Sequence, residues 1–128
     1  MQMSEYLKAN GLRFKVPDEV FEISRCLSAD VPKKAFAVIV HEDEITVVRA
    51  LVPGEEAYAG RRYRLISFLV ELPMDLVGFL SIVSTALARR GIPIFVISSF
   101  RTDHLLVLEQ DLEESIEALR SCGFSCER

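Results

Sequence analysis

The stretch of residues 73–111 constrains the fold of this chain most, because it predicts a helix and two strands in a set order. One face of an amphipathic helix is marked by apolar residues at spacings of four, three and four: Leu76, Leu80, Val83 and Leu87. Gly91 suits the left-handed residue that closes a helix. Two short apolar runs follow, residues 92–97 and 105–108, with a polar break between them. We therefore expect helix, strand, hairpin and strand.

The start of this helix is expected at Asp75, which follows Pro73 and is a good N-cap acceptor. Gly78 would then lie near the third helical position, where glycine costs about 1 kcal/mol against alanine and calls for a reason. One interpretation is that Gly78 lets a ligand approach the exposed N–H groups, where the helix dipole favours a carboxylate. The other is tight packing of the helix on a sheet, and the residues alone favour packing.

The other expected strands and the second helix complete a recognisable order. Strands are expected at residues 12–16, 20–26, 35–40, 45–51, 63–72 and 124–126. A second amphipathic helix should begin with a capping box at Asp111 and Glu114 and close at Gly123. Residues 61–128 thus predict a complete ferredoxin-like βαββαβ unit, an antiparallel sheet with both helices on one face. Residues 1–60 predict a degenerate copy, mainly strands and a hairpin.

Composition excludes several classes of function. The chain has 128 residues, half of them hydrophobic, and a net charge of −4, so it lacks the basic footprint of proteins that bind nucleic acid or anionic membranes. No apolar run approaches the roughly 20 residues that cross a bilayer, and no secretory signal pattern is present. An odd count of three cysteines fits reduced thiols in a cytoplasm.

Motifs for catalysis or metal binding are missing from the sequence. Cys122 and Cys126 have no nearby histidine and do not make a zinc site. His104 follows Asp103 directly in an expected strand, so the two side chains face opposite sides and do not form a catalytic pair. There is no Gly-rich phosphate loop and no GxSxG or HExxH motif. We expect no catalytic residue, no metal and no cofactor, and an enzyme is the third hypothesis.

Two segments resemble an ACT domain. Residues 75–82 read Asp-Leu-Val-Gly-Phe-Leu-Ser-Ile, and residues 90–107 read Arg-Gly-Ile-Pro-Ile-Phe-Val-Ile-Ser-Ser-Phe-Arg-Thr-Asp-His-Leu-Leu-Val. They are most similar to small stand-alone paired-ACT proteins related to the aspartokinase regulatory region and to cytosolic arginine sensors. Residues 21–25 and 35–38 resemble the shortened first ACT-like half of those proteins.

The resemblance implies a ligand groove between the helix start and the end of the strand that follows the helix. The residues it places there are Asp75, Leu76, Val77, Gly78, Phe79, Ser98, Ser99, Phe100 and Asp103. Asp103 would take a ligand cation and Phe100 would form a wall, whereas spacing alone favours ordinary hairpin-turn chemistry. Relatives often carry an acidic residue where Arg101 stands, so the identity of the ligand does not transfer.

The first hypothesis is a non-catalytic regulatory or sensor protein of ACT type that binds a small molecule, with an amino acid expected first. ACT domains often dimerise, and a βαββαβ sheet with its helices on one face leaves surface to cover, so a homodimer is expected. The alternative is a structural or protein-interaction module that has kept the ACT-like shape and binds no ligand.

Overall fold

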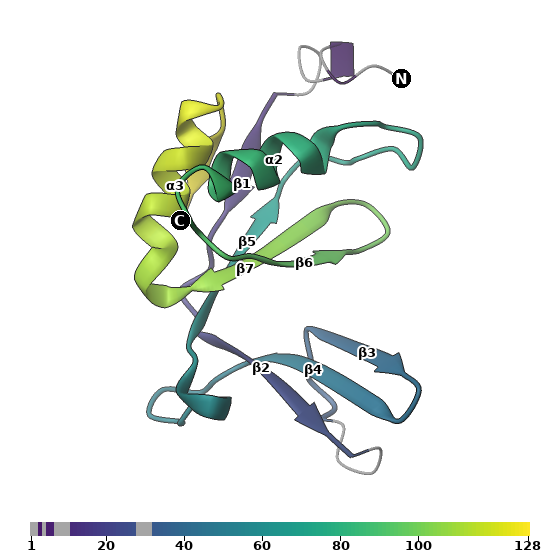
Figure 1. Ribbon diagram of the computed structural model, residues 1–128, viewed down its shortest axis with the longest axis vertical. Helices are drawn as coiled ribbons and strands as arrows, with labels where there is room; N and C mark the ends of the chain where they lie inside the picture. Colours follow the sequence, from purple (N-terminus) through teal and green to yellow (C-terminus); the bar gives the residue numbers. More distant parts are fainter. Residues whose placement is uncertain (1–2, 4, 7–10, 28–31) are drawn as a thin grey trace.

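The computed structural model describes residues 3, 5–6, 11–27 and 32–128, and its strands join in one eight-stranded sheet with helices α2 and α3 beside it (Figure 1). The helices are α2 Phe79–Ala88 and α3 Leu112–Ser121, and short 3-10 turns lie at η2 Tyr58–Gly60 and η3 Glu109–Asp111. The strands are β1 Arg13–Lys15, β2 Phe21–Cys26, β3 Ala37–His41, β4 Glu44–Ala50, β5 Tyr63–Phe68, β6 Phe95–Ser98, β7 Asp103–Leu108 and β8 Ser125–Glu127. No helix of these described residues is long and apolar enough to cross a membrane.

The second half has the expected ferredoxin-like order, β5-α2-β6-β7-α3-β8. Its sheet differs from the expectation in one respect, because β1 from the first half lies between β5 and β8. Phe14 of β1 pairs antiparallel with Phe68 of β5 and parallel with Cys126 of β8. The described sheet is therefore antiparallel as expected except at this edge, where β1 and β8 run parallel.

The remaining strands of the first half form a separate group that we call the wing, made of β2, β4 and β3. β4 pairs antiparallel with both β2 and β3, which confirms the expected hairpin. The wing meets β5 through one register pair, Phe21 with Tyr63. In Figure 1 it lies at the end of the molecule away from the helices. The division into residues 1–60 and 61–128 stays a prediction.

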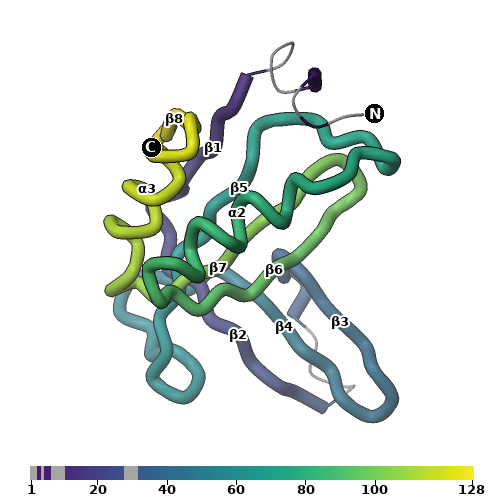
Figure 2. The backbone as a smooth tube through the Cα atoms, turned by 45° about the horizontal axis from the view of Figure 1, so that its top comes forward, coloured from purple at the N-terminus to yellow at the C-terminus, as the bar shows by residue number. Residues whose placement is uncertain are grey.

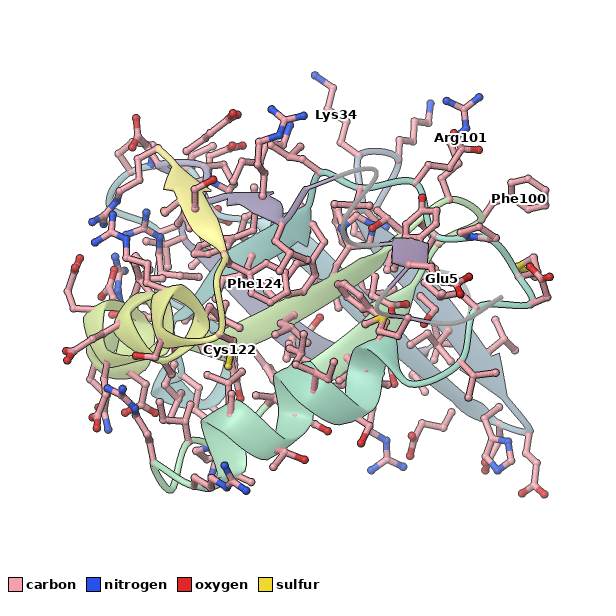
Figure 3. All side chains as sticks on the ribbon, turned by 90° about the horizontal axis from the view of Figure 1, so that it is seen from above. Glu5, Lys34, Phe100, Arg101, Cys122 and Phe124 are labelled. Atoms are coloured by element: carbon pink, nitrogen blue, oxygen red, sulfur yellow. The ribbon has the colours of Figure 1, made fainter. Side chains whose placement is uncertain are left out.

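The main core fills the space between the two helices and one face of the sheet. Alternate residues of the central strands point into it, including Ile66 and Phe68 of β5 and Leu105 of β7. Four phenylalanine rings cluster there with centroids 5.1–6.2 Å apart: Phe14, Phe68, Phe79 and Phe124. Figure 3 shows Phe124 directed into this interior. The cluster joins the first turn of α2 to β1, β5 and the segment entering β8.

A smaller core lies on the opposite face of the sheet. Leu65 of β5 and Leu106 of β7 point away from the helices and pack against Phe21 and Val48 of the wing. Ala37 of β3 joins this second cluster. In Figure 2 the β3–β4 hairpin extends from the molecule on the side of β6 and β7 away from α2. The wing therefore covers part of the face that a ferredoxin-like unit leaves bare.

Both helices are closed at the glycines that the sequence predicted. Gly91 and Gly123 have positive φ, and the N–H groups of Ile92 and Phe124 reach back to the carbonyls of Leu87 and Leu119. This 6→1 hydrogen bond is the Schellman closure expected of a glycine at C′.

Both expected N-terminal caps were wrong. α2 begins at Phe79 and its N-cap is Gly78, so Asp75 is not the N-cap and Gly78 does not lie at the third helical position. At α3, the side chain of the N-cap residue Asp111 makes no capping hydrogen bond, and Asp111 already has near-helical backbone angles because η3 leads directly into the helix. The carbonyl of Asp111 instead accepts a hydrogen bond from Ser115 Oγ at 2.7 Å.

Candidate functional site

A cavity of about 360 Å³ opens between the start of α2 and the β6–β7 turn, and we call it the α2 groove. Seven of the nine residues predicted for the site line it: Leu76, Gly78, Phe79, Ser98, Ser99, Phe100 and Asp103. Six further lining residues were not predicted: Leu72, Pro73, Met74, Leu80, Ser81 and Thr102. Leu80 and Ser81 belong to the first turn after Gly78, so a correct helix start would have predicted them.

Asp75 and Val77 were predicted for the site and do not line the groove. Both lie in the turn before the helix, where the N–H of Leu76 bonds to the carbonyl of Pro73. The side chain of Val77 faces solvent and is 76% exposed. The later helix start explains the difference, because it gives the approach to Gly78 an irregular path instead of a helical one.

The helix wall of the groove presents backbone N–H groups. Gly78 has φ of +96°, a left-handed conformation that any side chain would strain. The first N–H groups of a helix have no intrahelical acceptor, and Gly78, the N-cap residue of α2, has no side chain with which to cap them. A Cβ at Gly78 would meet no atom of the described residues within 4 Å outside the neighbouring residues, so the space on that side of Gly78 is open. The dipole at this end favours an anion.

The strand wall presents a carboxylate. Ser98 of β6 and Asp103 of β7 are a register pair, and Ser98 Oγ donates to Asp103 Oδ1 at 2.6 Å. The turn between them is held by Ser99, whose N–H and Oγ both donate to the carbonyl of Thr102. Phe100 lies at the tip of this turn, is 82% exposed, and projects from the body with Arg101 beside it (Figure 3). Phe100 thus contributes to the rim of the groove, with Arg101 near its mouth.

His104 lies on the other face of β7 from Asp103, as expected. Its Nδ1 is 2.8 Å from Ser67 Oγ and its Nε2 is 2.8 Å from Ser99 Oγ. Burial lowers the pKa of His104 below its ordinary value of 6.5, and the charge of Lys15 acts in the same direction. Asp103 opposes this shift. Ser99 therefore touches both the α2 groove and a histidine on the opposite side of the sheet.

The described residues contain no group of three or more histidine, cysteine, aspartate or glutamate side chains that could hold a metal ion. Cys26, Cys122 and Cys126 are free thiols. Burial raises the pKa of the Cys126 thiol, which disfavours the reactive thiolate.

A comparison with protein families matches residues 58–121 to the ACT domain. The match covers half of the chain, and the chain belongs to the ACT domain family. Domains of this family are typically regulatory, bind small molecules and are generally non-catalytic.

Solved structures support the fold over nearly the whole chain. Protein Atu0741 from Agobacterium tumefaciens is 26% identical, with a TM-score of 0.73 over 91% of this chain and 92% of its own. VC0802 from Vibrio cholerae, a protein of unknown function described as a possible transport protein, is 18% identical. Its TM-score is 0.71 over 91% of this chain and 95% of its own. No curated protein matches this chain.

Proposed function

We propose that this protein is a non-catalytic sensor that binds an amino acid in the α2 groove. One observation carries the proposal: the N-terminal end of α2 at Gly78 and the carboxylate of Asp103 line the same cavity. A free α-amino acid carries a carboxylate and an ammonium group, and each needs a partner of opposite charge when it leaves water. The helix start suits the carboxylate and Asp103 suits the ammonium group.

The size and the apolar lining of the groove agree with this ligand class. Leu72, Leu76 and Phe79 offer apolar surface for a side chain, and about 360 Å³ is at the lower end of small-molecule sites. The ACT domain match at residues 58–121 supports a small-molecule effector, and the resemblance of residues 75–82 and 90–107 to amino-acid-responsive ACT proteins is our reason for proposing an amino acid. Arg101 near the mouth adds a positive charge that disfavours a ligand with a cationic side chain.

A thermal-shift screen of the twenty amino acids tests the proposal. A ligand present at 100 times its dissociation constant should raise the unfolding free energy by about 2.7 kcal/mol. Gly78→Leu should abolish the shift, because the side chain would project before the helix N–H groups. Gly91→Leu is the matched control, since it imposes the same left-handed strain at the other end of α2, far from the groove. If both variants lost binding equally, backbone strain would explain the loss, and filling of the groove by the added side chain would not.

The role of Asp103 is tested separately. Asp103→Asn keeps the size of the side chain and removes its charge, so it should weaken the amino acid by about tenfold or more while leaving the melting temperature of the free protein nearly unchanged. Unchanged affinity in isothermal titration would contradict the assignment of the ammonium group to Asp103.

We also propose that the protein is a homodimer with the α2 groove at or near the contact. Apolar side chains are exposed around the groove: Met74, Val77, Leu80, Ile82 and Phe100. A second chain over this rim would bury them and narrow the groove. Light scattering that finds a monomer at all working concentrations would contradict the dimer.

The alternative, a protein-interaction module without a ligand, is favoured by a different surface. β3 is an edge strand whose Val38, Ile39 and Val40 are 41–69% exposed. An uncharged edge of this kind is a template for pairing with another strand. A dimer that responds to no amino acid, and that Val40→Lys dissociates, would favour this function over sensing.

A further inference from the structure

The face of the sheet opposite the helices carries a row of three polar side chains. Lys15 of β1 is the register partner of Ser67 of β5, and Ser67 is the register partner of His104 of β7. Residues directly paired across antiparallel strands point to the same face. A cation, a hydroxyl group and an imidazole therefore lie side by side across three neighbouring strands, outside the α2 groove.

This row lies in a cavity of about 500 Å³ that we call the sheet-face pocket. Phe21 and Phe36 supply aromatic surface, with the Phe36 ring 6.0 Å from that of Phe21 and 5.2 Å from that of His104. Leu65 adds aliphatic surface. The pocket therefore combines an apolar wall with a polar row. The wall is formed mainly by Phe21 of β2 and by Phe36, which directly precedes β3, and the row lies on β1, β5 and β7.

The hydrogen bonds of the row favour one placement of its protons. With the Ser99 Oγ hydrogen donated to the carbonyl of Thr102, Ser99 accepts from His104 Nε2–H, and this is the tautomer that we infer. The neutral ring then has a bare Nδ1, which accepts the hydroxyl hydrogen of Ser67. If Nδ1 takes up a proton from solvent, Ser67 becomes the acceptor and its own hydrogen turns away from the ring. That hydrogen then lies beside Lys15, available to an anion.

We propose that the sheet-face pocket binds an organic carboxylate with an apolar body, and that His104 is protonated when the ligand binds. The carboxylate lies between the Lys15 ammonium and the Ser67 hydroxyl, and the body packs on Phe21 and Phe36. No bond between heavy atoms forms or breaks. One proton passes from solvent to His104 Nδ1, and the Ser67 hydroxyl hydrogen turns from Nδ1 to the ligand.

The charges around His104 fit this coupling. In the free protein, burial and Lys15 hold the pKa of His104 down, while Asp103 on the same strand opposes them. Glu19, the other charged residue of the pocket, is at its rim and is exposed. A bound carboxylate would neutralise Lys15 and add a negative charge near the ring, so it would raise the pKa of His104. Binding and protonation therefore favour each other.

Isothermal titration with phenylacetate tests the proposal on the intact protein. Phenylacetate should bind at least about tenfold more tightly than phenylacetamide, which lacks the charge, and than acetate, which lacks the body. An ordinary carboxylic acid stays ionised above pH 6, so among the ligand and the residues that line the pocket only His104 is expected to change charge in the range from pH 8 to 6. Affinity should rise as the pH falls, by up to about tenfold per unit for one proton.

Two variants and one control complete the test. Lys15→Met should weaken phenylacetate by about tenfold, whereas Arg89→Met, an equal loss of charge at the exposed end of α2, should have no effect. His104→Gln should remove the pH dependence, and in the native protein the His104 ring resonances should shift on binding. Gly78→Leu should leave phenylacetate binding intact, which separates this pocket from the α2 groove. No binding at millimolar concentration, equal affinity for phenylacetamide, or an unchanged Lys15→Met variant would overturn the proposal.

Discussion

Gly78 has a different role from the one its sequence context predicted. Asp75 after a proline is a common helix start, and on that basis Gly78 was placed inside the first turn. The structure begins the helix one residue after Gly78, because a left-handed glycine can turn the chain into a helix and cannot continue it. Propensity rules do not separate these two starts, since both contain an acceptor followed by apolar residues. The correct start makes Gly78, which has no side chain, the N-cap residue of α2.

The groove residues of the second wall were easier to predict. Ser98 and Asp103 lie symmetrically about a short polar turn, so pairing of the two strands brings them together. The resemblance to the ACT family placed both residues in the expected ligand site, and the pairing register of β6 and β7 explains why their side chains are in contact. Leu72 and Thr102 were missed because the first follows an irregular strand end and the second lies in a turn whose backbone path the sequence does not specify.

At the scale of single residues, His104 predicts a pH dependence of stability. Its pKa in the folded protein lies below 6.5, so the unfolded chain binds this proton more readily. The unfolding free energy of the free protein should therefore decrease as the pH falls from 7 through 6.5 and level off below the folded pKa. Urea denaturation at a series of pH values measures this.

The control is His104→Gln, which retains a side chain able to bond to Ser67 and cannot titrate. Its stability should lack this component between pH 7 and 5, while the contribution of exposed carboxylates at lower pH remains. An identical slope in the two proteins would show that His104 is not the source.

At the scale of elements, the aromatic cluster determines where α2 begins. Phe79 immediately follows Gly78, is 4% exposed, and packs edge-on against Phe68 at 5.1 Å. The groove is therefore positioned by a ring that is shared between the helix and the sheet core. Hydrophobic periodicity predicted Val83 and Leu87 as core, and both are fully buried, whereas Leu80 is 37% exposed on the groove side.

Phe124→Ala tests this cluster. Phe124 contacts Phe14, Phe68 and Phe79, so its loss should leave a cavity and reduce the unfolding free energy by about 3–5 kcal/mol. Phe124→Leu should cost less because most of the volume is kept. Chemical denaturation of both variants measures the difference, and a cost below about 1 kcal/mol for alanine would contradict a shared cluster.

At the scale of the whole molecule, the sequence predicted each strand found in residues 11–27 and 32–128, and it did not predict where β1 pairs. Three residues of β1 carry no signal that distinguishes pairing with a neighbour in sequence from pairing with β5 and β8. The partner is chosen by the unfilled edge of β5 and by Phe14, whose ring completes the aromatic cluster. Arg64 illustrates the same limit, because nothing in its sequence context indicates that it is half-buried and donates a hydrogen bond to the carbonyl of Pro17.

A fragment of residues 61–128 should not fold alone. It would lose β1, which is the strand that β8 pairs with in the described structure, and it would expose the edge of β5. Circular dichroism should show no cooperative melting. A peptide of residues 11–17 added to it should restore melting, and the same peptide with Phe14→Ala should not. Cooperative unfolding of the fragment by itself would support the proposed division into independent halves.

The place of β1 also bears on how fast the molecule folds. Arg13 and Glu127 form an ion pair at 2.9 Å although they are 114 positions apart in sequence. A contact of this separation forms only after nearly the entire chain has been drawn together, and proteins rich in such contacts fold slowly. β1 is therefore synthesised early, but it is held in place only once β8 has formed. Until both strands are in place, the edge of β5 remains open to pairing with strands of other chains.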